Sequence, residues 1–248
     1  MKPTSISKPR SSNQTMSHNN QKKPRKPKNK RRQQQRWRRK HNKPLLCEQP
    51  TYPSFPNQNW FSWRNENICQ QIYKPIVVVA GSSMASRLNE YSLQTSKSLV
   101  KLTYESGCTC FKMLSWLRSI EGQEMMYGAS RIILILGTND LHVMRAGETV
   151  HRIRETVEAI RLLYPRVQVV WQLLQWRMKA TRYLSDGIEV LKELDKCNIM
   201  LLELSRRLNF QTIDPRLTKD HIGKDNLHPT YEGSRIIEHS IRLFLERQ

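Results

Sequence analysis

The chain has 248 residues and a formal net charge of +21 at pH 7, most of it near the N-terminus. Residues 1–50 hold 16 Lys and Arg against one acid, Glu48, and so carry +15, while residues 51–248 carry the remaining +6. The chain after the basic segment is long enough for one α/β domain of about 170 to 180 residues. No uncharged apolar run approaches the roughly 18 residues of a membrane span, and the first residues lack the apolar core of a signal peptide, so we expect an intracellular protein, nuclear or cytoplasmic, that is neither secreted nor membrane-spanning.

Cysteine usage limits the kinds of structural site. The cysteines are odd in number and have no CxxC spacing, which argues against both a disulfide framework and a structural zinc site. We expect free thiols at Cys47, Cys69, Cys108, Cys110 and Cys197.

Residues 1–43 form a strongly basic arm. Segment 22–43 has almost no aliphatic side chains and cannot bury enough apolar surface to offset chain entropy, so we predict that the arm is disordered. Its charge suits phosphate neutralisation, and Trp37, between two arginines, suits stacking on an unpaired base, so RNA or single-stranded DNA is the expected partner. A nuclear-import signal and a solubilising tail are the alternatives. The residues expected to contact nucleic acid are Lys22, Lys23, Arg25, Lys26, Lys28, Lys30, Arg31, Arg32, Arg36, Trp37, Arg38, Arg39 and Lys40.

Residues 44–73 have the composition of a linker rich in proline and aromatic residues. Prolines at positions 44, 50, 53 and 56 argue against regular structure. We expect the aromatic cluster of Trp60, Phe61 and Trp63 to pack on the surface of the following domain, with binding of a partner as the alternative.

From residue 74 onward the hydrophobic pattern alternates between strand and helix. Ile76 to Ala80 is a run of five apolar residues bounded by Pro75 and Gly81, which is typical of a strand buried on both faces. In chain order the pattern predicts strands at 76–80, 99–104, 131–136, 167–174 and 212–214, and helices at 84–91, 110–120, 148–164, 183–208 and 230–245. Alternating strands and helices predict an α/β domain over residues 74–248, with a parallel sheet covered on both faces.

Four short polar stretches fall at the ends of these elements. Gly81-Ser82-Ser83 follows the first strand, 106–109 the second and 137–140 the third, while 225–229 precedes the last helix. Because the carboxyl ends of parallel strands meet at one edge of a sheet, we expect these stretches to form one site. Together they supply a hydroxyl nucleophile, backbone and amide donors, and a carboxylate three residues before an imidazole, which are the groups that acyl transfer requires.

At these residues the sequence resembles the SGNH, or GDSL-type, hydrolase family, from about residue 76 to the C-terminus. The GDS block of the family appears as Gly81-Ser82-Ser83, its second-block glycine matches Gly107, and its GxND and DxxH blocks are intact as 137–140 and 225–228. The resemblance implies a three-layer, flavodoxin-like fold with a central parallel sheet. It also implies a serine esterase that hydrolyses a carboxylic ester, either an acetyl or a lipid ester.

The resemblance further implies a role for each residue. Ser83 would be the nucleophile, His228 would take its proton, and Asp225 would orient the imidazole and stabilise its charged form. The backbone N–H groups of Ser83 and Gly107 and the side-chain amide of Asn139 would surround the oxyanion. No metal or organic cofactor is required.

Each of these residues also has a structural interpretation. Ser82 or Ser83 can serve only as a helix N-cap, and the glycines can be present for their backbone dihedral angles. Asn139 or Asp140 can cap the segment that follows, and 225–228 can be a capped turn before a proline.

One position departs from the family pattern, because Ser82 stands where the family has the aspartate of its GDS block. A hydroxyl can still form hydrogen bonds but brings no charge to the nucleophile turn. The alternative to a working esterase is therefore a catalytically weak or inactive SGNH-like module in a nucleic-acid-binding protein. A basic arm before such a domain is similar in layout to the esterase-domain proteins of non-LTR retrotransposons.

Two loops expected to border the site are basic. Segments 141–147 and 175–182 contain Arg145, Arg177, Lys179 and Arg182. These charges indicate either an anionic substrate or a solvated rim.

Overall fold

Five parallel strands form the central sheet, in the order β2-β1-β3-β4-β5. The computed structural model describes residues 74–248, so the expectations for the arm, 1–43, and the linker, 44–73, lie outside the described residues. The strands are β1 (Ile76–Gly81), β2 (Leu99–Tyr104), β3 (Ala129–Ile135), β4 (Gln168–Gln172) and β5 (Gln211–Ile213). At its last residue β1 is flanked by Tyr104 of β2 and Ile135 of β3, so the turns that follow these three strands lie at one edge of the sheet.

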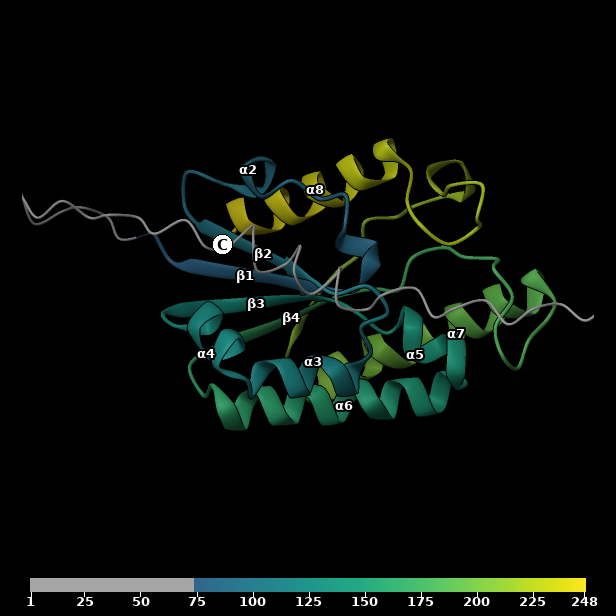
Figure 1. Cartoon of the computed structure of the whole chain (residues 1–248), viewed down its shortest axis with the longest axis horizontal. Helices are drawn as coiled ribbons and strands as arrows, with labels where there is room; N and C mark the ends of the chain where they lie inside the picture. Colours follow the sequence, from purple (N-terminus) through teal and green to yellow (C-terminus); the bar gives the residue numbers. More distant parts are fainter. Residues whose placement is uncertain (1–73) are drawn as a thin grey trace, which may run out of the picture. The chain divides into compact units, whose positions relative to one another are not determined.

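Helices cover both faces of the sheet (Figure 1), with α2 and α8 on one face and α3, α4, α6 and α7 on the other. The helical segments are the 3-10 turn η1 (Ser83–Ala85), α2 (Glu90–Leu93), α3 (Cys110–Leu117), α4 (Ile120–Met126), α5 (Thr138–Val143), α6 (Ala146–Leu163), α7 (Gly187–Arg207), the 3-10 turn η2 (Lys219–His221) and α8 (Tyr231–Glu246). The predicted α/β fold with a parallel sheet between two layers of helices is confirmed. No helix within residues 74–248 has the length and apolar character needed to cross a membrane.

The side chains of β1 alternate between two hydrophobic cores. Val77 and Val79 pack with α8 and η1, whereas Val78 and Ala80 pack with α3, α6 and α7. All four are at most 1% exposed, which is why this strand reads as a continuous apolar run and not as an alternating one.

The helix predicted at 84–91 is wrong, because side-chain caps divide this segment. The Oγ of Ser82 accepts a hydrogen bond from the N–H of Met84 and begins η1, which lasts one turn. Asn89 then begins α2, its Oδ1 accepting from the N–H of Tyr91 at 2.9 Å. The segment predicted as one helix at 110–120 is divided in the same way, because Ser119 caps the separate helix α4.

The exposed edge of the sheet at β2 is closed by two side chains. Gln94 accepts from the N–H of Val100 and donates to its carbonyl, at 2.9 and 2.8 Å. Glu90 accepts from the N–H of Leu102 at 3.0 Å. Because these side chains occupy groups that a further strand would use, they protect the edge from pairing with another chain.

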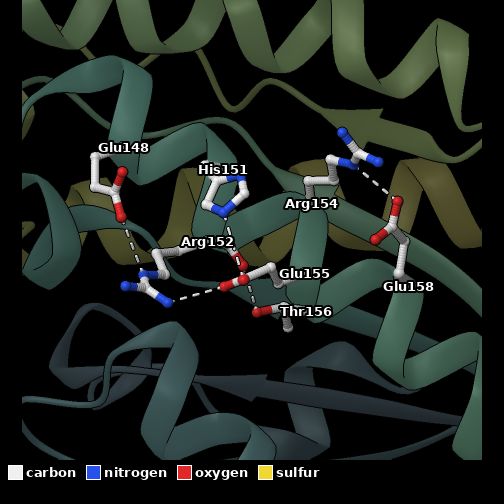
Figure 2. A network of polar contacts seen from close by, with 7 residues as sticks. All are labelled: Glu148, His151, Arg152, Arg154, Glu155, Thr156 and Glu158. Carbon is white, nitrogen blue, oxygen red and sulfur yellow. Dashed lines mark hydrogen bonds and ion pairs between the residues drawn. The ribbon is translucent and has the colours of Figure 1, made fainter.

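The outward face of α6 carries a network of ion pairs, shown in Figure 2. Arg152 contacts Glu148 at 3.3 Å and Glu155 at 3.0 Å, and the imidazole of His151 also contacts Glu155. Because these pairs lie three or four residues apart, they keep the outer face of the helix polar while the opposite face packs in the core.

Candidate active site

The turn after β1 gives its two serines different surroundings. Gly81 leaves little room for a side chain here, because a Cβ would lie 3.0 Å from the side chains of both Ala85 and Ile135 and would have to displace them. Ser82 is buried, its N–H donates to the carbonyl of Ile135 at 3.1 Å, and its hydroxyl caps η1. Ser83 is only partly buried, and its hydroxyl oxygen lies within hydrogen-bond distance of the imidazole of His228. Of the two serines, Ser82 is therefore the N-cap.

Ser83, His228 and Asp225 form a continuous chain of hydrogen bonds. Ser83 Oγ lies 2.9 Å from His228 Nε2, and His228 Nδ1 lies 2.5 Å from Asp225 Oδ2. The other carboxylate oxygen, Oδ1, accepts from the N–H groups of His228 and Leu227 at 3.0 and 3.2 Å. A hydrogen bond from the N–H of Gly223 to the carbonyl of His228, at 2.8 Å, closes the turn that holds the acid and the imidazole.

These contacts define the protonation states in the chain. Burial tends to raise the pKa of Asp225, but hydrogen bonds from the His228 ring and from the N–H groups of His228 and Leu227 outweigh it and lower the pKa to about 2. A carboxylate only accepts hydrogen bonds, so His228 Nδ1 carries the proton and Nε2 accepts from the Ser83 hydroxyl. The arrangement can deprotonate Ser83 during attack and hold the resulting positive charge beside Asp225.

The predicted oxyanion donors lie in the turns that flank β1. Asn139 is in α5, just after β3, and its Nδ2 donates to the carbonyl of Cys108 at 2.8 Å, which fixes the amide beside Gly107. Gly107 has a φ of +73°, a conformation that favours glycine. The backbone N–H groups of Ser83 and Gly107 donate to no group within residues 74–248. One N–H of the Asn139 amide also has no described partner, so none of these three donors is fully engaged within residues 74–248.

Asp140 has a structural contact that the sequence did not indicate. It is buried, and both of its carboxylate oxygens accept from the N–H of Cys110, at 3.2 Å each. Asp140 thus adds a second side-chain acceptor at the start of α3, beside the N-cap Thr109, and joins the turn after β3 to the turn after β2. Burial raises its pKa, against the opposing effect of the hydrogen bonds from Cys110.

The two cysteines beside this turn are buried thiols. Cys108 and Cys110 are each 1% exposed. Burial, with a further contribution from the charge of Glu105, raises the pKa of Cys108 to about 12, and burial also raises the pKa of Cys110. Neither residue therefore has the thiolate character of a reactive cysteine.

A small polar pocket adjoins Ser83 and His228. Its volume is about 310 Å³, and it lies between the segment that follows β1 and the turn that contains Asp225. Neither Gly107 nor Asn139 contributes to its wall. The lining residues are Ser83, Met84, Ser86, Arg87, Gly223, Lys224, Asp225, His228, Pro229 and Ser234.

The basic residues expected to border the site are not the ones that line this pocket. Arg177 is 1% exposed and therefore belongs to the interior and not to a solvated rim. Arg145 lines a separate pocket, and Arg182 stacks on the ring of Tyr183 at 5.8 Å. Arg87 and Lys224 are the basic residues of the pocket, and sequence reasoning missed both because neither lies in the two basic loops.

Comparison with solved structures identifies the fold. A GDSL-like lipase from Bacteroides thetaiotaomicron superimposes with a TM-score of 0.56 at 15% sequence identity, covering 69% of this chain and 88% of that chain. The fold is that of the GDSL-like lipases. A member of the lipolytic G-D-S-L family from Veillonella parvula gives a TM-score of 0.54 at 19% identity, covering 70% of this chain and 99% of its own. A carbohydrate acetylesterase family member from Sinorhizobium meliloti gives 0.55 at 14% identity, covering 70% and 98%.

In sequence, a scan against protein-family models finds no match, and a search of the curated proteins finds no relative. The likeness to GDSL-like proteins is therefore one of fold. It covers about 70% of this chain in each of the three structures.

Proposed function

We propose that residues 74–248 form a serine esterase that hydrolyses short-chain carboxylic esters, such as acetyl esters. The observation that carries the proposal is the hydrogen-bonded chain from Ser83 Oγ through His228 to Asp225, with distances of 2.9 and 2.5 Å, on a GDSL-like fold. Ser82 in place of an aspartate leaves this chain complete, because Ser82 contacts only backbone groups of its own turn and of β3.

In the proposed mechanism, Ser83 Oγ attacks the ester carbonyl carbon while His228 Nε2 takes the hydroxyl proton. The N–H groups of Ser83 and Gly107 and the amide of Asn139 stabilise the negative oxygen of the tetrahedral intermediate. The intermediate collapses as His228 returns the proton to the departing alcohol, which leaves an acyl group on Ser83. Water, deprotonated by His228, then attacks the carbonyl carbon of the acyl-enzyme, and His228 gives that proton to Ser83 Oγ as the bond between Oγ and the acyl carbon breaks, which releases the carboxylic acid and restores the free enzyme.

The pocket supports a small acyl group over a lipid chain. Its volume is about 310 Å³, and Met84 and Pro229 are its only apolar side chains. A long acyl chain would gain little from such a wall, because burial of apolar surface contributes only about 25 cal/mol per Å² and most of this wall is polar.

We also propose that the basic arm, residues 1–43, binds RNA or single-stranded DNA and so brings the esterase to nucleic acid inside the cell. The support is its sequence, with 16 of the 42 Lys and Arg of the chain and Trp37 between two arginines. The layout is similar to that of the esterase-domain proteins of non-LTR retrotransposons, which pair a basic arm with a domain of this type.

The experiment that tests the esterase is hydrolysis of 4-nitrophenyl acetate by the full chain and by Ser83→Ala. We expect the variant to lose at least about 1,000-fold in kcat/KM, because it lacks the nucleophile. Ser115→Ala is the matched control, since the Ser115 hydroxyl is exposed on α3 and donates only to the carbonyl of Phe111 in the same helix.

Equal activity in the parent and in Ser83→Ala would remove Ser83 from the mechanism. If the folded parent hydrolyses no short-chain ester, the result favours the alternative function, in which the domain is a catalytically weak module of a nucleic-acid-binding protein. This alternative rests on Ser82, which stands where the SGNH family has the aspartate of its GDS block.

A further inference from the structure

The pocket beside Ser83 holds two positive charges that the proposed mechanism does not use. Arg87 and Lys224 both line it, one from the segment after η1 and one from the turn that contains Asp225. Neither forms an ion pair with any residue in 74–248. Among the described residues, Asp225 supplies the only carboxylate in the wall, and His228 already engages it.

A hydrogen bond to a backbone carbonyl holds the Arg87 side chain in the pocket wall. One guanidinium N–H donates to the carbonyl of Pro229 at 2.9 Å, and its remaining N–H groups donate to no described residue. Pro229 directly follows His228 in the chain, and Arg87 and His228 line the same pocket. Guanidinium donors suit carboxylate and phosphate oxygens, which accept two hydrogen bonds side by side.

We propose that this pocket is an anion subsite, and that the ester hydrolysed here carries a carboxylate or phosphate close to its scissile carbonyl. The proposal rests on the esterase function and specifies its substrate class. Arg87 and Lys224 are exposed and have no ion-pair partner within residues 74–248, so their charges give the pocket a modest, solvent-screened positive field that favours an anionic ester over a neutral one of equal size.

The test compares a neutral ester, 4-nitrophenyl acetate, with an anionic one, 4-nitrophenyl hemisuccinate, in the parent and in Arg87→Gln/Lys224→Gln. We expect the double variant to lose roughly 2- to 5-fold per charge in kcat/KM for the anionic ester, with less change for the neutral ester. Arg87→Lys keeps the charge and controls for the contact with Pro229. Lys219→Gln is the matched control, an exposed lysine of η2 that is not part of the pocket.

Comparing the binding of inorganic phosphate with that of acetate shows whether the pocket recognises a phosphate or a carboxylate. Binding is followed by NMR shifts, which need no turnover, so this arm remains informative if no ester is hydrolysed. Phosphate or acetate that binds the parent and not the double variant supports the subsite even if the esterase proposal fails. Equal use of both esters, together with ligand binding unchanged by the double substitution, would overturn it.

A second, independent observation concerns Arg177, a buried cation. Its guanidinium donates to the carbonyl of Thr138 at 2.9 Å and to that of Lys179 at 3.2 Å, while its Nε has no described partner. No carboxylate within residues 74–248 pairs with it. Burial of a charge without an opposite charge is destabilising, so this arrangement is not explained by stability.

The segment that begins with Arg177 contacts both halves of the site. Thr138, which Arg177 holds, directly precedes Asn139 of the oxyanion group. The N–H groups of Met178 and Lys179 both donate to the carbonyl of Asn226 at 3.1 Å, and Asn226 lies between Asp225 and His228. Residues 177–179 therefore connect the turn with the amide donor to the turn with the acid and the base.

We infer that Arg177 is a positioning residue that holds Asn139 in register with the acid–base turn. Thr138–Asn139 and Asp225–His228 are joined by no strand ladder, so the bonds of residues 177–179 fix their separation. Loss of the Arg177 contact would misplace a transition-state donor without removing a substrate contact, which lowers kcat more than it changes KM.

The test is Arg177→Met in the full chain, with Arg177→Lys as the conservative variant and Arg161→Met as the matched control. Arg161 also donates to two backbone carbonyls, those of Leu208 and Asn209, on exposed surface. We expect Arg177→Met to lower kcat about 10-fold or more with KM nearly unchanged, and the charge retained in Arg177→Lys to restore part of it. The Arg161 variant should keep its kcat.

Two further measurements distinguish a positioning role of Arg177 from a purely stabilising one, and one of them does not depend on esterase activity. Arg177→Met should unfold at the same urea concentration as the parent or higher, because the buried charge is gone. The NMR signals of the Asn139 amide, identified with Asn139→Asp, should shift in Arg177→Met even if the parent shows no turnover. Unchanged signals and unchanged kcat in a folded variant would overturn the inference, and if Arg177→Met fails to fold, Arg177→Gln gives the same readouts.

Discussion

Ser82 and Ser83 are neighbours with the same hydroxyl, yet they contact different parts of the molecule. Ser82 is buried and caps η1, whereas Ser83 is partly open and lies 2.9 Å from His228. The sequence left open which of them was the cap. The end of β1 at Gly81 assigns it, because Ser82 has extended backbone and bonds to Ile135 as the last residue before η1, whereas Ser83 is the first residue of that 3-10 turn.

Asp225 predicts a pH dependence of stability. Its pKa of about 2 lies below the ordinary value of 3.8, so the folded state favours the ionised form. This stabilisation is complete above the ordinary pKa and is lost as pH falls from about 4 to about 2. The urea midpoint of the parent should therefore fall more steeply over this range than that of Asp225→Asn, which has no charge to lose.

Asp220→Asn, in the exposed turn η2, is the control for that series and should retain the acid dependence of the parent. Asp225→Asn should also reduce kcat, because an amide does not hold the imidazole with Nδ1 protonated. If Asp225→Asn and the parent lose the same stability between about pH 4 and about pH 2, the hydrogen bonds to the Asp225 carboxylate do not stabilise the folded state.

At the level of elements, the turns around the site are fixed by side-chain hydrogen bonds that reach between helices. Asp140 belongs to α5 but accepts from the first N–H of α3, and Asn139 of α5 contacts the turn just before α3. The position of Gly107 relative to Asn139 therefore depends on contacts between two helices, not on either helix alone.

Asp140→Ala removes the carboxylate that accepts from the first N–H of α3, while the N-cap of that helix, Thr109, stays in place. We expect the free energy of unfolding to fall by about 1–2 kcal/mol, the usual effect of losing a hydrogen-bond acceptor at a helix N-terminus. Activity of the folded fraction should also fall, because the turn that presents Gly107 loses its anchor. Urea denaturation and kcat/KM measure the two effects.

Asp186→Ala is the matched control for that change. Asp186 caps α7 by accepting from the N–H of Ile188 at 3.0 Å, so its loss should destabilise the domain to a similar extent. It contacts none of the site turns, and the folded fraction should keep its kcat/KM. A similar loss of kcat/KM in both variants would show that α3 has no special link to the site.

At the level of the whole molecule, the site is assembled from distant parts of the chain. Ser83 and His228 are 145 residues apart in sequence and meet because β1 lies inside the sheet while the turn before α8 returns to the same edge. The pocket between them exists only when both segments are in place.

The size of that pocket predicts a preference for short acyl chains. With a volume of about 310 Å³ and a mostly polar wall, kcat/KM should decrease from 4-nitrophenyl acetate to the octanoate. The series acetate, butyrate, hexanoate and octanoate measures this, with Ser83→Ala as the background at each length. A rate that rises with chain length would instead indicate a lipid ester.

The charge of the arm predicts a steep salt dependence of nucleic-acid binding. Residues 1–43 hold 16 basic residues, while residues 74–248 hold 25 basic and 19 acidic residues. Affinity for a fluorescent single-stranded RNA should fall with a log–log slope of about −0.7 for each phosphate neutralised. Deletion of residues 1–43 should remove both the affinity and most of the slope, while RNA binding unchanged by the deletion would exclude the arm as the binding site.

The sequence by itself predicted the five strands and the polar turns at their ends, while the resemblance to the SGNH family implied the roles of Ser83, His228 and Asp225. The sequence could do so because a strand buried on both faces has an apolar run, and because turns at strand ends carry recognisable polar residues. It did not separate η1 from α2 or α3 from α4, since apolar spacing continues across the caps at Asn89 and Ser119.

Only the tertiary structure decided that Arg177 is buried, that Asp140 bonds to another helix, and that Arg87 and Lys224 share the pocket with Ser83. A charged residue in a polar loop has the same local sequence whether it faces solvent or the interior. Its surroundings depend on which segments the sheet brings to one edge, and these contacts lie far apart along the chain.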